Sequence, residues 1–208
     1  MATNNVFDLT TGLISYWQLS DIQGTSVPDS FGSNTGTATS LSESDRSDGY
    51  NHIRDSLTFD GSADFITVSD DTSLQVLSDN YSVLMWLRFT SAANTIIMEK
   101  GVNDEMAIQT FSGGIRWAGA NTIDSVSTIN TNIWYHVVLV ASGTSGFIYV
   151  NGKLDQTGGD KTQGTPNSSD FIIASRATRF SGDMQVLMIY NRALTQLEIE
   201  LLYSHQLQ

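Results

Sequence analysis

Two closely spaced pairs of carboxylates are the strongest candidates for catalytic chemistry in this sequence. Glu43 and Asp45 form one pair, and Glu198 and Glu200 form the other, each separated by one residue. On a β-strand this spacing points both side chains to one face, where one carboxyl group acts as acid and the other as nucleophile on a glycosidic bond. The first pair, however, lies in a polar loop, and the second lies in an expected helix, where residues i and i+2 do not share a face. We therefore expect no carboxylate pair that cleaves glycosides.

Other groups with catalytic chemistry are sparse. The three histidines, His52, His136 and His205, form no His-x-x-x-His pair for zinc, and we expect His136 to be a structural histidine within a strand. The absence of cysteine excludes disulfides, thiol catalysis and cysteine-ligated metals. Neither a Gly-x-Ser-x-Gly elbow nor a glycine-rich phosphate loop occurs. The sequence therefore predicts a protein that is not an enzyme.

The overall charge excludes several kinds of partner. Ten lysines and arginines stand against 22 aspartates and glutamates, which gives a formal charge of −12 over 208 residues, and the basic residues form no cluster. Such a chain gains nothing from the release of counterions by phosphates, so we expect no nucleic-acid partner. No apolar stretch reaches the roughly 18 residues that a membrane span needs, so no membrane insertion is expected. The first residues also lack the charged and apolar regions of a signal peptide.

Almost the whole chain has the two-residue periodicity of β-strands. In residues 81–89, two alternating sets of side chains are both largely apolar, which indicates a strand covered on both faces. Aromatic and β-branched residues dominate further segments at residues 13–19, 56–68, 95–98, 106–111, 115–118, 133–140, 147–150, 171–174 and 184–190. The polar stretches 23–54 and 158–170 are expected to be loops. Many short strands separated by turns predict an all-β, two-sheet antiparallel sandwich.

Turn and capping residues add detail at the C-terminal half. Asn151 and Gly152 supply the two positive φ angles of a type I′ hairpin. One short helix is expected to close the chain, because Thr195 and Glu198 have the spacing of a capping box. The expected hydrophobic staple consists of Leu194 and Ile199, and the expected apolar stripe consists of Leu197, Leu201 and Leu202. A helix this short must dock on the sandwich to be stable.

Three sequence motifs occur in a recognisable order. They are FDGxxDxxxV at residues 59–68, WYH followed by YVNG at residues 134–152, and IYNRAL at residues 189–194 before the acidic helix. This ordered set resembles the laminin-G-like domain of the concanavalin A-like lectin and glucanase superfamily. The resemblance implies a jelly-roll sandwich with a groove on one side. We expect one such domain over residues 12–208, preceded by an N-terminal arm of residues 1–11.

The resemblance also implies candidate ligands for a structural calcium ion, which takes six to eight oxygen atoms. The pentraxin branch binds calcium with an Asn and an Asp in a turn that corresponds to Asn103 and Asp104, although Ser175 and Arg176 replace its second acidic cluster here. Laminin-G-like relatives hold calcium near an edge whose oxygen-bearing residues here are Asp21, Asp29, Asn34 and Asp183. The alternative is that these are turn residues that bind their own backbone.

Glycan binding in this fold uses aromatic rings against the C–H face of a sugar and planar polar groups for its hydroxyls. Trp17, Trp86 and Trp134 lie inside apolar strands and are expected in the core. Trp117 precedes a loop of small residues and is the tryptophan that we expect to be exposed, with a core position as the alternative. The candidate glycan-binding residues are therefore Trp117, Arg116, Asn121 and Arg179.

The context of the domain gives the functional prediction. Stand-alone laminin-G-like chains without a signal peptide resemble virion proteins of tailed bacteriophages, such as capsid decoration proteins, head fibres and tail adhesins. We therefore predict a structural and adhesive protein on a virion or extracellular surface, with virion proteins or surface glycans as partners. Repeated display favours a homo-oligomer of closed symmetry. A free carbohydrate-binding lectin module is the alternative.

Overall fold

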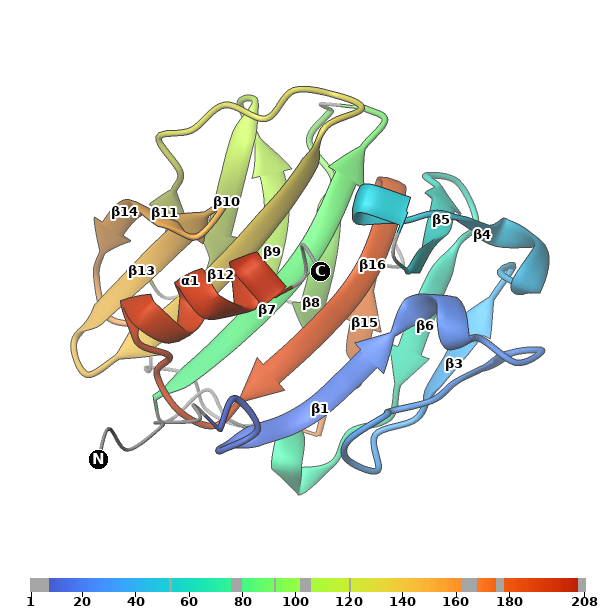
Figure 1. Ribbon diagram of the computed structural model, residues 1–208, viewed down its shortest axis with the longest axis horizontal. Coiled ribbons are helices and arrows are strands. Elements are labelled where there is room, and N and C mark those ends of the chain that lie inside the picture. Colours follow the sequence, from blue (N-terminus) through green and yellow to red (C-terminus); the bar gives the residue numbers. More distant parts are fainter. Residues whose placement is uncertain are drawn as a thin grey trace, which may run out of the picture.

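Two antiparallel sheets pack face to face, and one short helix lies across the outside of one of them (Figure 1). The computed structural model describes residues 8–52, 54–75, 80–91, 93–101, 106–119, 121–161, 168–174 and 178–205. The predicted all-β sandwich with a C-terminal helix is therefore confirmed. No helix in this described part of the chain combines the length and apolar character of a membrane span.

The two sheets are named here for their places in Figure 1. The front sheet has the order β14 (Lys153–Gly158), β13 (Ser145–Val150), β12 (Trp134–Ser142), β7 (Tyr81–Phe89), β16 (Ser181–Tyr190), β5 (Asp55–Asp60) and β4 (Arg46–Asp48), and β1 (Leu13–Gln18) also pairs with β16. The back sheet has the order β11 (Ile123–Asp124), β10 (Gly114–Ala118), β9 (Met106–Phe111), β8 (Ile96–Lys100), β15 (Phe171–Ile173), β6 (Phe65–Val68), β3 (Gly36–Thr39) and β2 (Ser26–Val27).

The strands with strong apolar alternation lie where the sequence predicts them. Strands β2, β3 and β4 were not predicted and fall within the stretch expected to be a loop, because they are short and built of small or polar residues. Within the described residues, single turns of 3-10 helix connect some of the strands: η1 (Leu19–Asp21), η2 (Glu43–Asp45), η3 (Tyr50–His52) and η4 (Thr72–Leu74). The predicted hairpin is also confirmed, since Asn151 and Gly152 have φ angles of 51° and 77° between β13 and β14.

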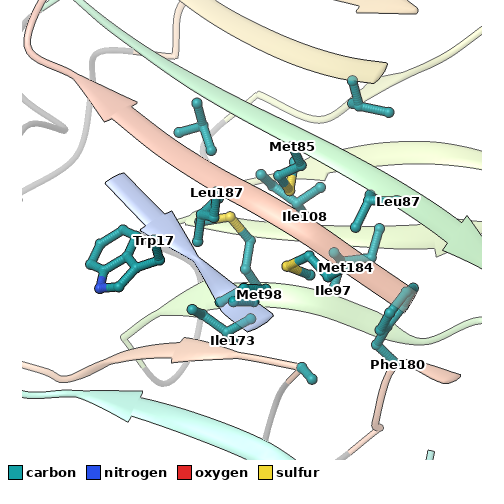
Figure 2. Close-up of a cluster of buried hydrophobic side chains, with 14 of the residues drawn as sticks. Trp17, Met85, Leu87, Ile97, Met98, Ile108, Ile173, Phe180, Met184 and Leu187 are labelled. Carbon is teal, nitrogen blue, oxygen red and sulfur yellow. The ribbon is translucent and has the colours of Figure 1, made fainter. Parts of the chain in front are cut away.

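The main core fills the space between the sheets. Figure 2 shows Met85 and Leu187 of the front sheet together with Met98 and Ile108 of the back sheet. These four side chains are fully buried, and Trp17 closes one end of the cluster with its ring stacked 5.9 Å from that of Phe171. Burial of this kind is the main source of stability for a sandwich without disulfides.

A second apolar cluster covers the outer face of the front sheet. Helix α1 (Gln196–His205) lies across β7, β12 and β13 in Figure 1 and buries Ile199 and Leu202 against the sheet. The predicted capping box is present: the Thr195 amide donates to Glu198 Oε2 at 2.8 Å, and the Glu198 amide donates to Thr195 Oγ1 at 3.3 Å. The predicted apolar stripe is wrong at Leu197, which is 47% exposed, because the buried face of the helix runs through Ile199 and Leu202.

Two aromatic residues from different elements cover Trp86 at the centre of this outer cluster. Tyr50 of η3 stacks on the Trp86 ring at 4.2 Å, and Tyr203 of α1 stacks on it at 5.7 Å. In Figure 1, η3 is the cyan turn in front of the end of β16 that lies farthest from β1. Between them, η3 and α1 therefore cover the outer cluster around Trp86.

Candidate functional site

Asp29 and Asn34, two of the predicted calcium ligands, are committed to the fold. The Asp29 carboxylate accepts hydrogen bonds from the backbone amides of Tyr16, Phe31, Gly32 and Asn34 at 2.9–3.1 Å. Burial opposes the ionisation of Asp29, but these four amides outweigh it and hold the pKa of the carboxyl group below its usual value. This geometry is that of a carboxylate that fixes a loop.

The other predicted calcium ligands do not complete a metal site with Asp29. Asn34 is 6% exposed, and its side-chain amide donates to the hydroxyls of Ser15 and Ser73. Asp21 is exposed at the end of η1, and Asp183 of β16 accepts hydrogen bonds from Ser47, Thr58 and Arg88. Asn103 and Asp104 lie outside the described residues. The described part of the chain holds no group of three acidic or histidine side chains that could bind a metal. Binding of calcium through carbonyl and amide oxygens, or through Asn103 and Asp104, stays a prediction.

Trp117 does not lie on the surface, which corrects the expectation of an exposed ring. It is 0% exposed, because Ile115 and Trp117 alternate along β10 on the face that meets the core. The ammonium group of Lys161 lies 4.9 Å from the centre of the Trp117 ring and donates to the backbone carbonyls of Trp117, Ala118 and Asn121. Burial lowers the pKa of Lys161 to about 8, and the three carbonyls hold its charged form.

The other three predicted glycan ligands have structural partners in the fold. Arg116 forms a two-point ion pair with Asp124 at 2.6 and 2.7 Å. The Asn121 side chain donates to the Asp160 carbonyl at 2.8 Å. The Arg179 guanidinium donates to the Ser62 carbonyl and lies 5.6 Å from the centre of the Phe65 ring. The structure therefore does not gather Arg116, Asn121 and Arg179 around an exposed Trp117.

An open depression of about 690 Å³ lies instead at the end of the front sheet. We call it the Trp134 depression, and it is lined by Ser47, Asp48, Gly49, Tyr50, His52, Arg88, Ile133 and Trp134. Trp134 is partly exposed and Ile133 is 49% exposed, so an aromatic ring and an aliphatic side chain lie next to each other on the surface. The expectation that Trp134 belongs to the core is confirmed only in part, because the residue packs against the outer apolar cluster but stays partly exposed.

The sheet register brings the main residues of the depression together. Trp134 begins β12 and is paired with Arg88 of β7, so both side chains project from the outer face. The guanidinium carbon of Arg88 lies 5.3 Å from the centre of the Trp134 ring. The opposite wall is η3, which is fixed by a hydrogen bond of 2.8 Å from the Tyr50 amide to Gln185 Oε1. Gly49 permits this tight turn, since a Cβ atom there would collide with the Arg54 carbonyl oxygen.

A buried carboxylate fixes Arg88 from below. Asp183 is 3% exposed in its side chain, and its Oδ2 accepts a hydrogen bond of 2.8 Å from Arg88 Nε. Its Oδ1 accepts from the hydroxyls of Ser47 at 2.8 Å and Thr58 at 2.6 Å. Both oxygens of Asp183 are therefore occupied, and the Arg88 side chain, 31% exposed, has a fixed base.

The depression has the composition of a binding surface. Trp134 and Ile133 offer apolar area, and His52, Asp48 and Arg88 offer polar groups around it. His52 and Asp48 lie 3.1 Å apart, but their side chains are 79% and 73% exposed, so nothing desolvates them for acid–base chemistry. One sequence signal for the site existed: Trp134 and Ile133 directly follow a polar turn, and residues at a strand end lie at the rim of a sheet.

The family is shown by the sequence itself. A family model described as the concanavalin A-like lectin/glucanases superfamily matches residues 60–200. The chain belongs to this superfamily. The resemblance drawn from the three motifs is thereby confirmed, and the front sheet with its depression is one of the two sheets of that sandwich. No curated protein sequence gives a match to the chain.

Several solved structures share the fold at low sequence identity. The binding domain of Paraclostridial Mosquitocidal Protein 1 matches with a TM-score of 0.78 and 16% identity, over 96% of this chain and 53% of that one. Trypanosoma rangeli sialidase in complex with sialic acid matches with a TM-score of 0.71 and 17% identity, over 95% of this chain and 33% of the sialidase. The chain thus spans about half the length of the mosquitocidal binding domain and about a third of the length of the sialidase.

One further structure is matched along nearly its whole length. It is domain 4 of AbnA, an extracellular arabinanase from Geobacillus stearothermophilus, in complex with arabinotriose. Its TM-score is 0.69 with 20% identity, over 92% of this chain and 98% of that domain. At such identities these similarities establish the fold, which the chain shares with lectin-like and carbohydrate-binding domains.

Proposed function

We propose that the protein is a non-enzymatic glycan-binding module of the lectin type, and that the Trp134 depression holds the sugar. The observation that carries this proposal is the partly exposed Trp134 beside the exposed Ile133 in the depression next to η3. A sugar ring packs its C–H face on such apolar area, while planar groups such as the Arg88 guanidinium bind its oxygens. Two structures with this fold support the proposal, because one is in complex with arabinotriose and another, a botulinum neurotoxin binding domain, with SialylT.

A glycan array, followed by titration calorimetry on the best ligand, tests the proposal. Trp134→Ala is expected to weaken binding about tenfold or more, since central aromatic residues dominate such interfaces. Phe31→Ala is the control, because Phe31 is an exposed aromatic residue (49%) that does not line the depression. A wild-type protein that binds no glycan, or a Trp134→Ala variant that binds as the wild type does, contradicts the proposal.

We further propose that this binding serves adhesion on a surface, with the protein displayed as a homo-oligomer on a bacteriophage virion. The chain is acidic, contains no cysteine and is rich in Ser, Thr and Gly, and this composition is compatible with display outside a cell. Antibody labelling of purified phage particles by electron microscopy tests this proposal. Labelled capsids or tails support it, whereas protein found free of particles supports the alternative of a free lectin module.

A further inference from the structure

Arg88 has hydrogen-bonding capacity that the fold does not use. A guanidinium group carries five N–H donors in one plane. Only the Nε–H of Arg88 is engaged, by Asp183 at 2.8 Å, and the two Nη groups have no hydrogen-bond partner in the described part of the chain. Because Arg88 lines the Trp134 depression, these donors are available to a ligand there.

From this geometry we infer that the depression selects sugars that carry a carboxylate, and that Arg88 is the residue that determines this specificity. The inference rests on the proposed glycan-binding function and names the ligand class of the same site. Two Nη groups in one plane match the two oxygens of a carboxylate, so that both hydrogen bonds form together. The adjacent Trp134 and Ile133 provide the apolar contact for the sugar ring, which distinguishes an acidic sugar from a free anion.

The position of Arg88 is fixed before a ligand arrives. Asp183 holds Nε from below and is itself held by the hydroxyls of Ser47 and Thr58, while the guanidinium carbon lies 5.3 Å from the centre of the Trp134 ring. A long side chain that is already ordered loses little conformational entropy on binding. The guanidinium group of Arg88 is therefore already oriented for a planar acceptor, whereas the side chain of a mobile surface arginine would first have to be ordered.

The negative charges of the protein do not outweigh these contacts. The formal charge of −12 repels an anion at long range, but salt screens exposed charges beyond about 8 Å in physiological buffer. Asp183 is buried on the Nε side of Arg88, and the exposed Asp48 lies 3.1 Å from His52. Direct charge-assisted hydrogen bonds, which are roughly twice as strong as neutral ones, therefore decide the preference.

Paired ligands test the inference on the wild-type protein. Binding is measured by calorimetry for oligosaccharides that contain a hexuronic acid or a nonulosonic acid, each beside its carboxyl-reduced form. We expect each bound acidic sugar to bind about tenfold or more tightly than its reduced form, since hydrogen bonds to charged groups contribute at this level. The two arms identify which acid the depression accepts. Equal affinities for acidic and reduced forms overturn the inference.

Variants of Arg88 test its role directly. Arg88→Lys keeps the charge above Asp183 but loses the planar fork, so the preference for the acidic form is expected to fall to about threefold or less. Because removal of Arg88 alone leaves Asp183 buried without a counter-charge, the second variant combines Arg88→Met with Asp183→Asn and is expected to abolish the preference. Lys153→Gln is the control, since it removes one positive charge from the exposed edge strand β14.

The outcomes separate the two proposals. If the wild type binds no glycan, the proposed function itself fails. If it binds neutral sugars and Arg88→Lys leaves their affinity unchanged with no preference for acids, the proposed function stands and the inference is overturned. If both Arg88 variants lose acidic and reduced forms to the same extent, Arg88 binds hydroxyl groups instead, which also overturns it.

Discussion

His136 is expected to make the fold sensitive to acid. Its side chain is 0% exposed, between the rings of Trp86 at 5.2 Å and Tyr203 at 5.6 Å, and neither ring nitrogen has a hydrogen-bond partner among the described residues. Burial lowers the pKa of His136 from 6.5 to about 3, because the charged imidazolium ion loses its hydration in the interior. The expectation of a structural histidine agrees with this environment.

The sign and size of the effect follow from proton linkage. Between pH 6.5 and about pH 3 the unfolded chain binds a proton at His136 that the folded chain does not bind, so stability decreases as the pH falls through this range. Each pH unit below 6.5 lowers the free energy of unfolding by about 1.4 kcal/mol. At pH 4.5 the contribution of His136 therefore amounts to a loss of about 3 kcal/mol relative to pH 8.

Urea unfolding of the wild type and of His136→Phe, measured from pH 8 to pH 4.5, isolates this contribution. The variant keeps an aromatic ring in the cluster and removes the titrating group, so all other ionisable residues change equally in the two proteins. We expect the free energy of unfolding of the wild type to fall about 3 kcal/mol further than that of the variant over this range. Parallel pH profiles, or an NMR titration of folded His136 near pH 6.5, refute the reasoning.

Three further predictions concern the supports of the site. Glu198→Gln is expected to lower the free energy of unfolding by about 2 kcal/mol in urea near neutral pH, because Glu198 pairs with Arg192 and caps α1. Arg192 is the chief cause that lowers the pKa of Glu198 to about 2, so this stabilisation disappears as the pH falls from about 4.5. A variant as stable as the wild type near neutral pH contradicts this prediction. Asp29→Asn is expected to cost about 2–3 kcal/mol, since one amide oxygen cannot serve four backbone amides, whereas Asp21→Asn as control costs nothing measurable. Thermal melting with calcium and with chelator is expected to give equal midpoints, and a calcium-dependent rise shows that a metal binds the folded state after all.

The parts of the fold that the sequence predicts are those where local pattern and tertiary burial agree. Strand β7 was predicted with its observed bounds, because both of its faces are apolar and both are covered. The capping box and the Asn151-Gly152 hairpin depend only on neighbouring residues, so they too could be predicted. Strand β3 could not, because its small polar residues become a strand only through pairing with β6.

The tryptophans show why the candidate site could not be located from the sequence. The small residues that follow Trp117 favoured an exposed ring, but on β10 Trp117 shares with Ile115 the face that packs on the core, so its ring is buried. On β12 both faces are apolar in sequence, so exposure of Trp134 depends on how far α1 and η3 extend over the sheet. That extent is a property of the folded molecule, and no local pattern contains it.

The polarity of the open end of the front sheet is also informative about function. Where α1 covers the outer face, the positions under it are apolar or uncharged, as at Val138 and His136. Beside η3 the same face carries Arg88 and the buried Asp183. A buried ion pair contributes little stability compared with apolar residues of similar size, because desolvation offsets the attraction between the charges. Stability alone therefore gives no reason for this pair, whereas an arginine held in a fixed orientation at the edge of a depression is what recognition of a planar acceptor requires.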